Sequence, residues 1–180
     1  MRPTLLFALA LLAAGCDSQD AAPANAQSVR FPALTGRVVD RADLLSPEHE
    51  RRIEAASAAV EREVGPQFVV ATVDSLEGRP IEEYGVDLGR HWGVGRRGRN
   101  DGVILLVAPN ERRVRIEVGT GLERRVTDPF AAEVLRRFAL PRFREGDMAG
   151  GILAASDAIV SRLRSPKTDA QLAAEDGLVP

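Results

Sequence analysis

The sequence is poor in the residue types that build disulfide scaffolds and thiolate metal sites. Among 180 residues there is one cysteine, Cys16, so neither a disulfide within the chain nor a site of several thiolates can form. With 24 basic and 26 acidic residues the net charge is −2, which excludes the strongly basic surface typical of nucleic-acid binding. A hydrophobic core must therefore hold the chain together, and one domain over residues 31–164 is long enough to bury such a core.

Several catalytic and cofactor signatures are also missing. The chain has no G-x-S-x-G elbow, no P-loop and no H-E-x-x-H string, and its two histidines, His49 and His91, fall on separate predicted helices, so a serine hydrolase is not expected. Residues 93–98 match the letters of the G-x-G-x-x-G fingerprint. These glycines follow a predicted helix and lead into a strand, whereas a pyrophosphate cradle needs them to lead into a helix N-terminus. We therefore expect no nucleotide ligand.

The first residues carry the pattern of a signal peptide. Arg2 precedes an apolar run over residues 5–14, and the small residues Ala13, Ala14 and Gly15 stand directly before Cys16. The run is too short to span a bilayer comfortably. Residues 12–16, Leu-Ala-Ala-Gly-Cys, resemble a bacterial lipobox, with Ala13 where a larger aliphatic residue is usual.

The lipobox resemblance implies that Cys16 becomes the acylated first residue of the mature chain. Several acyl chains would hold the protein firmly on a membrane. We therefore expect a signal peptide at 1–15, a flexible tether at 16–30, and a location on the cell membrane facing the periplasm or the cell exterior. The alternative is an ordinary secreted protein that is cleaved nearby and keeps one unpaired thiol.

Apolar periodicity predicts alternating helices and strands within residues 31–164. We expect helices over 47–64, 81–92, 128–138 and 148–163, and strands over 67–73, 103–107 and 113–118. The last two strands should form an antiparallel hairpin because a short connection joins them. After Ser165-Pro166, the tail at 165–180 is expected to be poorly ordered.

This order of elements predicts an α/β fold, namely a three-layer α/β/α sandwich with a small mixed sheet. In open sheets of this kind the crevice that binds ligands lies at strand ends. We expect the loops at 39–45, 93–102 and 119–128 to meet at one such end.

Oxygen-bearing side chains gather in those three loops. They are Asp40, Asp43, Asn100, Asp101 and Asp128. Carboxylates that converge repel one another unless a cation sits among them, and Ca²⁺ or Mg²⁺ takes oxygen ligands of this kind. The alternative is that each acid serves its own loop, with Asp40 as a turn acceptor, residues 100–102 as a turn, and Thr127 or Asp128 as a helix cap.

Several ordered blocks of the sequence resemble the TPM domain family. The blocks are residues 38–46 (VVDRADLLS), 92–95 (WGVG), 100–107 (NDGVILLV), 115–123 (RIEVGTGLE) and 127–128 (TD). The resemblance implies an α/β/α sandwich that binds divalent cations through loop acids at the sheet end. Carried over by motif, it favours Asp40, Asp101 and Asp128 as ligands, with Asp43 and Asn100 as further candidates.

The resemblance also implies two functions. Family roles in photosystem repair and receptor modulation suggest a lipid-anchored accessory protein that binds Ca²⁺ or Mg²⁺ and assists the assembly, repair or regulation of integral-membrane protein complexes. Plant relatives are described as acid phosphatases, so metal-dependent hydrolysis of phosphomonoesters is the alternative. We favour the accessory role because the sequence supplies no clear nucleophile or proton donor.

Overall fold

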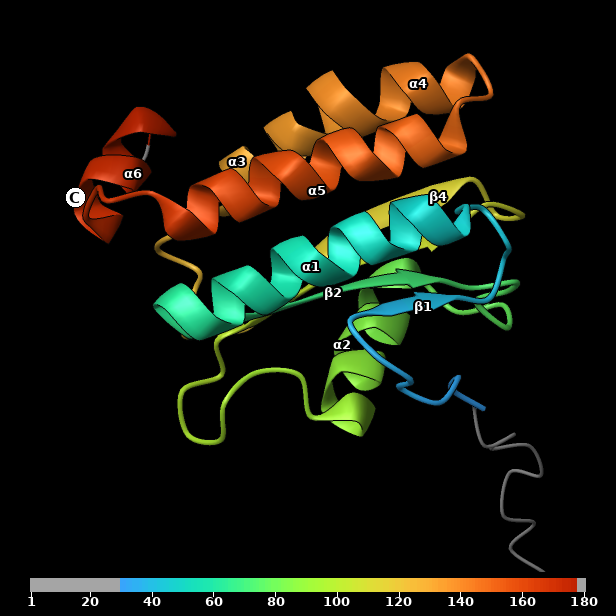
Figure 1. Cartoon of the computed structure of the whole chain (residues 1–180), viewed down its shortest axis with the longest axis horizontal. Helices are drawn as coiled ribbons and strands as arrows, with labels where there is room; N and C mark the ends of the chain where they lie inside the picture. The colour runs from blue at the N-terminus through green and yellow to red at the C-terminus, as the bar shows by residue number, and fades with distance from the viewer. Residues whose placement is uncertain (1–29, 178–180) are drawn as a thin grey trace, which may run out of the picture.

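The computed structural model describes residues 30–177, which fold into a four-stranded sheet and its covering helices (Figure 1). The predicted signal peptide, Cys16 and most of the predicted tether lie outside these residues. In chain order the elements are β1 (Val38–Asp40), α1 (Pro47–Val64), β2 (Gln67–Thr72), α2 (Ile81–Trp92), β3 (Gly102–Ala108), β4 (Arg113–Val118), α3 (Asp128–Val134), the π-helical turn η1 (Leu135–Ala139), α4 (Leu140–Arg144), α5 (Met148–Arg164) and α6 (Asp169–Glu175).

The sheet is mixed, as the sequence predicts. Its strand order is β1-β2-β3-β4, with the first three strands parallel and β4 antiparallel to β3. Every residue of β3 is buried, which is the expected composition of a central strand covered on both faces.

Alternate residues of the central strands point to opposite faces, and each face has its own helices. Val70 and Leu105 pack in one core with the buried residues of α1 and α5. Ala71 and Leu106 pack in a second core with α2. Figure 1 shows α1 and α5 side by side on one face and α2 on the other. The predicted three-layer sandwich is therefore confirmed.

The connections after β1 and β2 leave the sheet toward opposite faces. The strand order advances in one direction through β1, β2 and β3, yet α1 covers one face and α2 the other. The two crossovers consequently have opposite hands, and one of them departs from the right-handed rule. Connections that leave two neighbouring strands toward opposite faces of the sheet open a crevice between the carboxyl ends of those strands. Open α/β sheets bind their ligands in such a crevice.

The structure differs from the sequence predictions at three short elements. β1 was not predicted, because a strand of three residues shows no periodicity. Residues 141–143, which fall between the predicted helices at 128–138 and 148–163, lie in α4, which the π-helical turn joins to α3 through a bond from the Leu140 amide to the Leu135 carbonyl. The expectation of a poorly ordered tail is contradicted at residues 169–175, which form α6 behind a capping box at Thr168 and Gln171.

Candidate functional site

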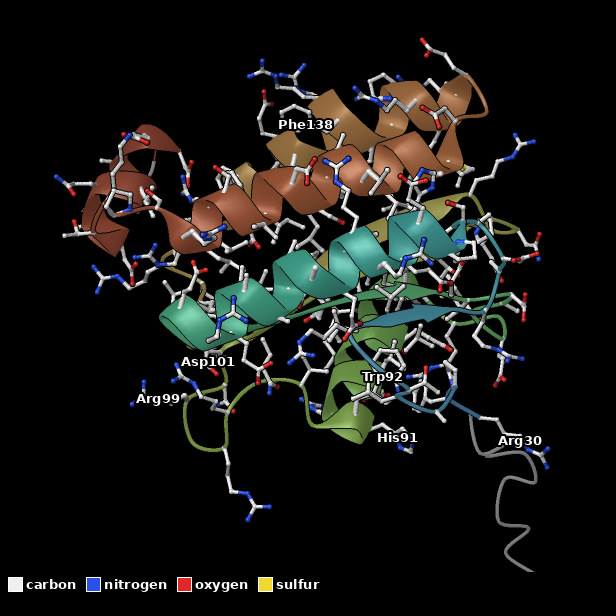
Figure 2. The ribbon with its side chains drawn as sticks, in the orientation of Figure 1. Arg30, His91, Trp92, Arg99, Asp101 and Phe138 are labelled. Carbon is white, nitrogen blue, oxygen red and sulfur yellow. The ribbon has the colours of Figure 1, made fainter. Side chains whose placement is uncertain are left out.

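The acids predicted to converge lie at two opposite ends of the sheet. Asp40 ends β1 and pairs in register with Thr72, the last residue of β2. Asp101 precedes Gly102, which pairs with Gln67, the first residue of β2. Five residues of strand, about 17 Å, separate these positions. Figure 2 shows Asp101 on the left of the molecule and Arg30, which precedes β1, on the right.

The predicted meeting of the three loops is therefore wrong, and the reason is strand direction. The loop at 39–45 follows β1 and lies at its carboxyl end. The loop at 93–102 precedes β3 and lies at its amino end, and the loop at 119–128 follows the antiparallel β4 to that same end. Parallel pairing of β1, β2 and β3 consequently places Asp40 and Asp43 away from Asn100, Asp101 and Asp128.

Asp40 organises its own turn. Its Oδ2 accepts a hydrogen bond from the Leu45 amide at 2.7 Å, and its Oδ1 accepts one from the Thr72 hydroxyl. Thr72 in turn accepts from the Ala42 amide at 2.9 Å. Asp43, the next acid, is exposed and has φ of 52°. Asp40 is thus a turn acceptor, and each of its oxygens accepts one of the two hydrogen bonds that a carboxylate oxygen can accept.

Asp101 forms a closed ion pair with Arg96. Its carboxylate is buried and accepts from the Arg96 amide and from the Arg96 Nε, each at 2.7 Å, and from the guanidinium Nη2. Burial raises the pKa of Asp101, but the hydrogen bonds and charge of Arg96 outweigh burial, and the net pKa is lowered. A carboxylate held in this way has little capacity left for a metal ion.

The glycines around Asn100 bring two backbones together. A Cβ on Gly119 would lie 2.1 Å from the Asn100 carbonyl oxygen, and one on Gly121 would lie 1.9 Å from the Arg99 carbonyl oxygen. The Gly121 amide donates to the Asn100 carbonyl at 3.0 Å. These glycines therefore let one loop pack against the other, which explains them without a bound ion.

Asp128 is the exposed first residue of α3, and Thr127 before it is the helix cap. The Thr127 Oγ1 accepts from the Phe130 amide at 3.2 Å. Within residues 30–177, no three or more His, Cys, Asp or Glu side chains are grouped to hold a metal ion. The five predicted ligands therefore do not form one preformed cation site, and cation binding stays a prediction.

A crevice of about 530 Å³ opens at the carboxyl ends of β1 and β2, where the two crossovers diverge. Its walls come from the loop after β1, the loop after β2, and the segment that enters the sheet from Arg30. Its charged lining residues are Arg30, Asp40, Arg41, Glu50, Asp74 and Glu77. The place matches the position at which open α/β sheets bind ligands.

The crevice carries an excess of negative charge. In the part of the chain that the structure describes, none of its six charged side chains belongs to an ion pair. Burial raises the pKa of Tyr84, which lines the crevice, and the charges of Glu77 and Glu111 raise it further against the opposing effect of Arg79.

The β3–β4 connection fixes one wall of the crevice. Glu111 Oε1 accepts from the Leu76 amide at 2.8 Å and from the Ser75 hydroxyl at 3.0 Å, and the Asn110 amide group donates to the Asp74 carbonyl at 2.7 Å. This wall was not predicted from the sequence, because Asn110 and Glu111 were assigned only to the connection of a hairpin. The connection follows the carboxyl end of β3, and that position could have indicated that its side chains lie near the crevice.

A second cavity, of about 690 Å³, lies at the other end of the sheet between α2, β4 and the loop at 93–102. Its charged lining mixes Arg90, Arg96 and Arg97 with Glu117 and Glu123. Arg96 is paired with Asp101, and Glu117 accepts from the Arg115 Nε at 2.7 Å. Because its charges are mixed and partly neutralised, this cavity is a weaker candidate than the crevice.

Comparison with known proteins places the chain among TPM domains. The model of the TPM domain family matches residues 38–162. The solution structure of the N-terminal domain of a protein from P. gingivalis is 32% identical, with a TM-score of 0.67, and the match covers 72% of this chain and 82% of that one. No curated protein matches the chain.

Two further solved structures are similar in fold. The N-terminal domain of the cg2496 protein from Corynebacterium glutamicum is 23% identical, with a TM-score of 0.57, over 80% of this chain and 89% of that one. The BA42 protein from Bizionia argentinensis is 18% identical, with a TM-score of 0.57, over 66% of this chain and 81% of that one. None of the helices in residues 30–177 has the length and apolar character needed to span a bilayer.

Proposed function

Because the chain belongs to the TPM domain family, we propose that it is a membrane-tethered accessory module whose crevice binds a positively charged segment of an integral-membrane protein complex. The observation that carries the proposal is the group of four unpaired carboxylates at the carboxyl ends of β1 and β2. Elsewhere on this surface arginines neutralise many of the acids, for example Glu133 and Asp157. The crevice thus offers the charge that a basic segment would complement.

The Asp40 carboxylate and the backbone of the loop at 74–77 are held in place. Asp40 is oriented by Thr72 and the Leu45 amide, and the loop that carries Asp74 and Glu77 is fixed by the β3–β4 connection. Preorganised groups lose less conformational entropy when a ligand binds. The geometry therefore favours specific recognition over diffuse attraction.

The predicted lipid anchor would place the crevice close to the membrane. Arg30 lines the crevice and follows Cys16 by 14 residues. A fully extended tether of that length reaches at most about 50 Å. We propose that acylated Cys16 holds the domain within this distance of the lipid surface, so that the crevice meets the exposed loops of a membrane protein.

We propose that Ca²⁺ competes for the same carboxylates. Ca²⁺ accepts irregular oxygen ligands, whereas Mg²⁺ demands a near-ideal octahedron. Since the described acids are not grouped as a coordination shell, the expected affinity is low. Asp40 is the one predicted ligand that lines the crevice.

Hydrolysis of phosphomonoesters is the less favoured alternative. A negative crevice repels a phosphate dianion, and the predicted acids that would share a metal lie at opposite ends of the sheet.

Site-specific crosslinking tests the binding role against this alternative. A photo-crosslinking residue at exposed Ser75, in the crevice, should give a reproducible membrane-protein adduct, and one at exposed Ser161 on α5 should not. Equal adducts from both positions, or none from either, would contradict the proposal.

A further inference from the structure

We propose that α6 occupies, within its own chain, a docking groove for acidic amphipathic helices of a partner protein. The groove is formed by Arg125, Thr127, Phe130 and Arg162, and it lies where α3 begins and α5 ends. Figure 1 shows α6 beyond the C-terminal end of α5. This inference does not depend on the proposed function.

Asp169 and Leu172 of α6 and Asp176, the residue that caps its C-terminus, anchor the helix. Asp169 pairs with the Arg125 Nε at 2.9 Å, Leu172 is 2% exposed, and Asp176 pairs with Arg162. They stand at positions i, i+3 and i+7, which lie on the same side of a helix. This is the anchor pattern by which amphipathic helices bind in grooves.

Arg162 forms the floor of the groove. Its guanidinium stacks 4.4 Å from the centre of the Phe130 ring and donates to the Arg125 carbonyl and to the Leu172 carbonyl, the latter at 3.2 Å. The side chain is 7% exposed. A planar guanidinium on an aromatic ring is preorganised to bind a carboxylate. The Asp176 carboxylate also accepts from the Thr127 hydroxyl at 2.5 Å.

The groove and its occupant belong to different parts of the chain. The family match ends at residue 162, so the groove lies within the TPM domain and α6 lies beyond it. A linker of four residues, 165–168, joins them. Arg125 donates to the carbonyls of Ser165 and Lys167 at 3.1 Å, so the same arginine that binds Asp169 also holds the linker. The linker bonds do not involve the two aspartates, so loss of the aspartate contacts should weaken the hold on α6 while the linker stays bound to Arg125.

The occupant that we infer is a partner helix with the pattern D-x-x-L-x-x-x-D, which reproduces the contacts of α6. Arg125 and Arg162 lie around the buried position that Leu172 occupies. A partner helix must bring one carboxylate to each arginine, because a guanidinium that is covered without an ion-pair partner loses its hydration and gains nothing in return. In this arrangement α6 competes with the partner helix for the groove, so removal of α6 raises the apparent affinity of the chain for the partner.

A synthetic peptide of residues 166–177 serves as the probe. Binding of the labelled peptide is measured by fluorescence anisotropy against the whole chain and against its D169N/D176N variant, with circular dichroism to show that both are folded. The variant should bind the wild-type peptide at least tenfold more tightly than the unchanged chain does. A peptide carrying D176N should bind at least tenfold more weakly.

The matched control is D157N/E175Q, which removes two carboxylates from exposed ion pairs and leaves the groove contacts intact. It should bind the peptide no better than the unchanged chain. A folded D169N/D176N chain that does not bind the peptide would overturn the proposal, as would equal binding of both peptides. If that variant dimerises instead, the groove joins copies of this chain, and the proposal of a separate partner is wrong.

Discussion

Asp101 and Arg96 close the loop at the amino end of β3 with one buried carboxylate and three hydrogen bonds. The Arg96 side chain is 40% exposed and that of Asp101 only 6%. The contribution of this pair to the free energy of unfolding therefore lies between that of an exposed and that of a fully buried ion pair. We expect D101N to lower the free energy of unfolding by about 2 kcal/mol, as measured by urea denaturation. A change below about 0.5 kcal/mol would show that the pair does not hold the loop.

The same carboxylate predicts how stability depends on pH. The pKa of Asp101 is lower in the folded chain than its ordinary value. Its contribution is therefore fully present above the unfolded pKa, near 3.9, and is lost as the pH falls through the folded value. The difference in stability between the unchanged chain and D101N should be constant from about pH 5 to 7 and shrink below about pH 4. A difference that grew at low pH would contradict this account.

Gly121 should not tolerate a side chain. Its Cβ would lie 1.9 Å from the Arg99 carbonyl oxygen, a backbone atom that cannot rotate away. G121A should cost about 3 kcal/mol or more, or prevent folding. G89A is the control, because its Cβ would meet only the Ile104 side chain at 3.4 Å within α2, and it should be neutral or stabilise by up to about 1 kcal/mol. Similar melting temperatures for the two variants would contradict the close backbone packing.

Calcium should raise the melting temperature by binding in the crevice and not at the other end of the sheet. With a dissociation constant near 1 mM, about 10 mM Ca²⁺ adds about 1.4 kcal/mol, or a few degrees. The rise should be lost in D40N, in which the amide oxygen can still accept from Leu45, and kept in D128N. If the rise were lost in D128N alone, the ion would bind at the end of the sheet that holds Asp101, and the proposal for the crevice would be wrong.

Much of the fold was predictable because local signals mark its longer elements. Ser46-Pro47 caps α1, and Gly65, with φ of 98°, ends it. Thr127 caps α3 ahead of Asp128-Pro129 in the same way. By contrast, the strand β1 contains three residues and pairs only with β2, so its existence depends on tertiary contacts that no local pattern records.

The candidate site was only partly predictable for the same reason. The acidic side chains were identified from the sequence, but their relative positions depend on strand direction. Once β1 is known to be parallel to β2, Asp40 must lie at the end opposite Asp101. The crevice acids Asp74 and Glu77 were missed because they follow β2 and share no motif with Asp40, and only the divergence of the two crossovers brings them together.

The most direct test of the binding role combines crosslinking with charge reversal. With the crosslinking residue at Ser75, D74K/E77K should reduce the yield of the membrane-protein adduct at least tenfold, because the variant replaces two carboxylates of the crevice with ammonium groups. E82K/E123K makes the same change in net charge at two exposed acids outside the crevice and should leave the yield unchanged. An adduct that persists in D74K/E77K, or falls equally in both variants, would contradict recognition through the crevice.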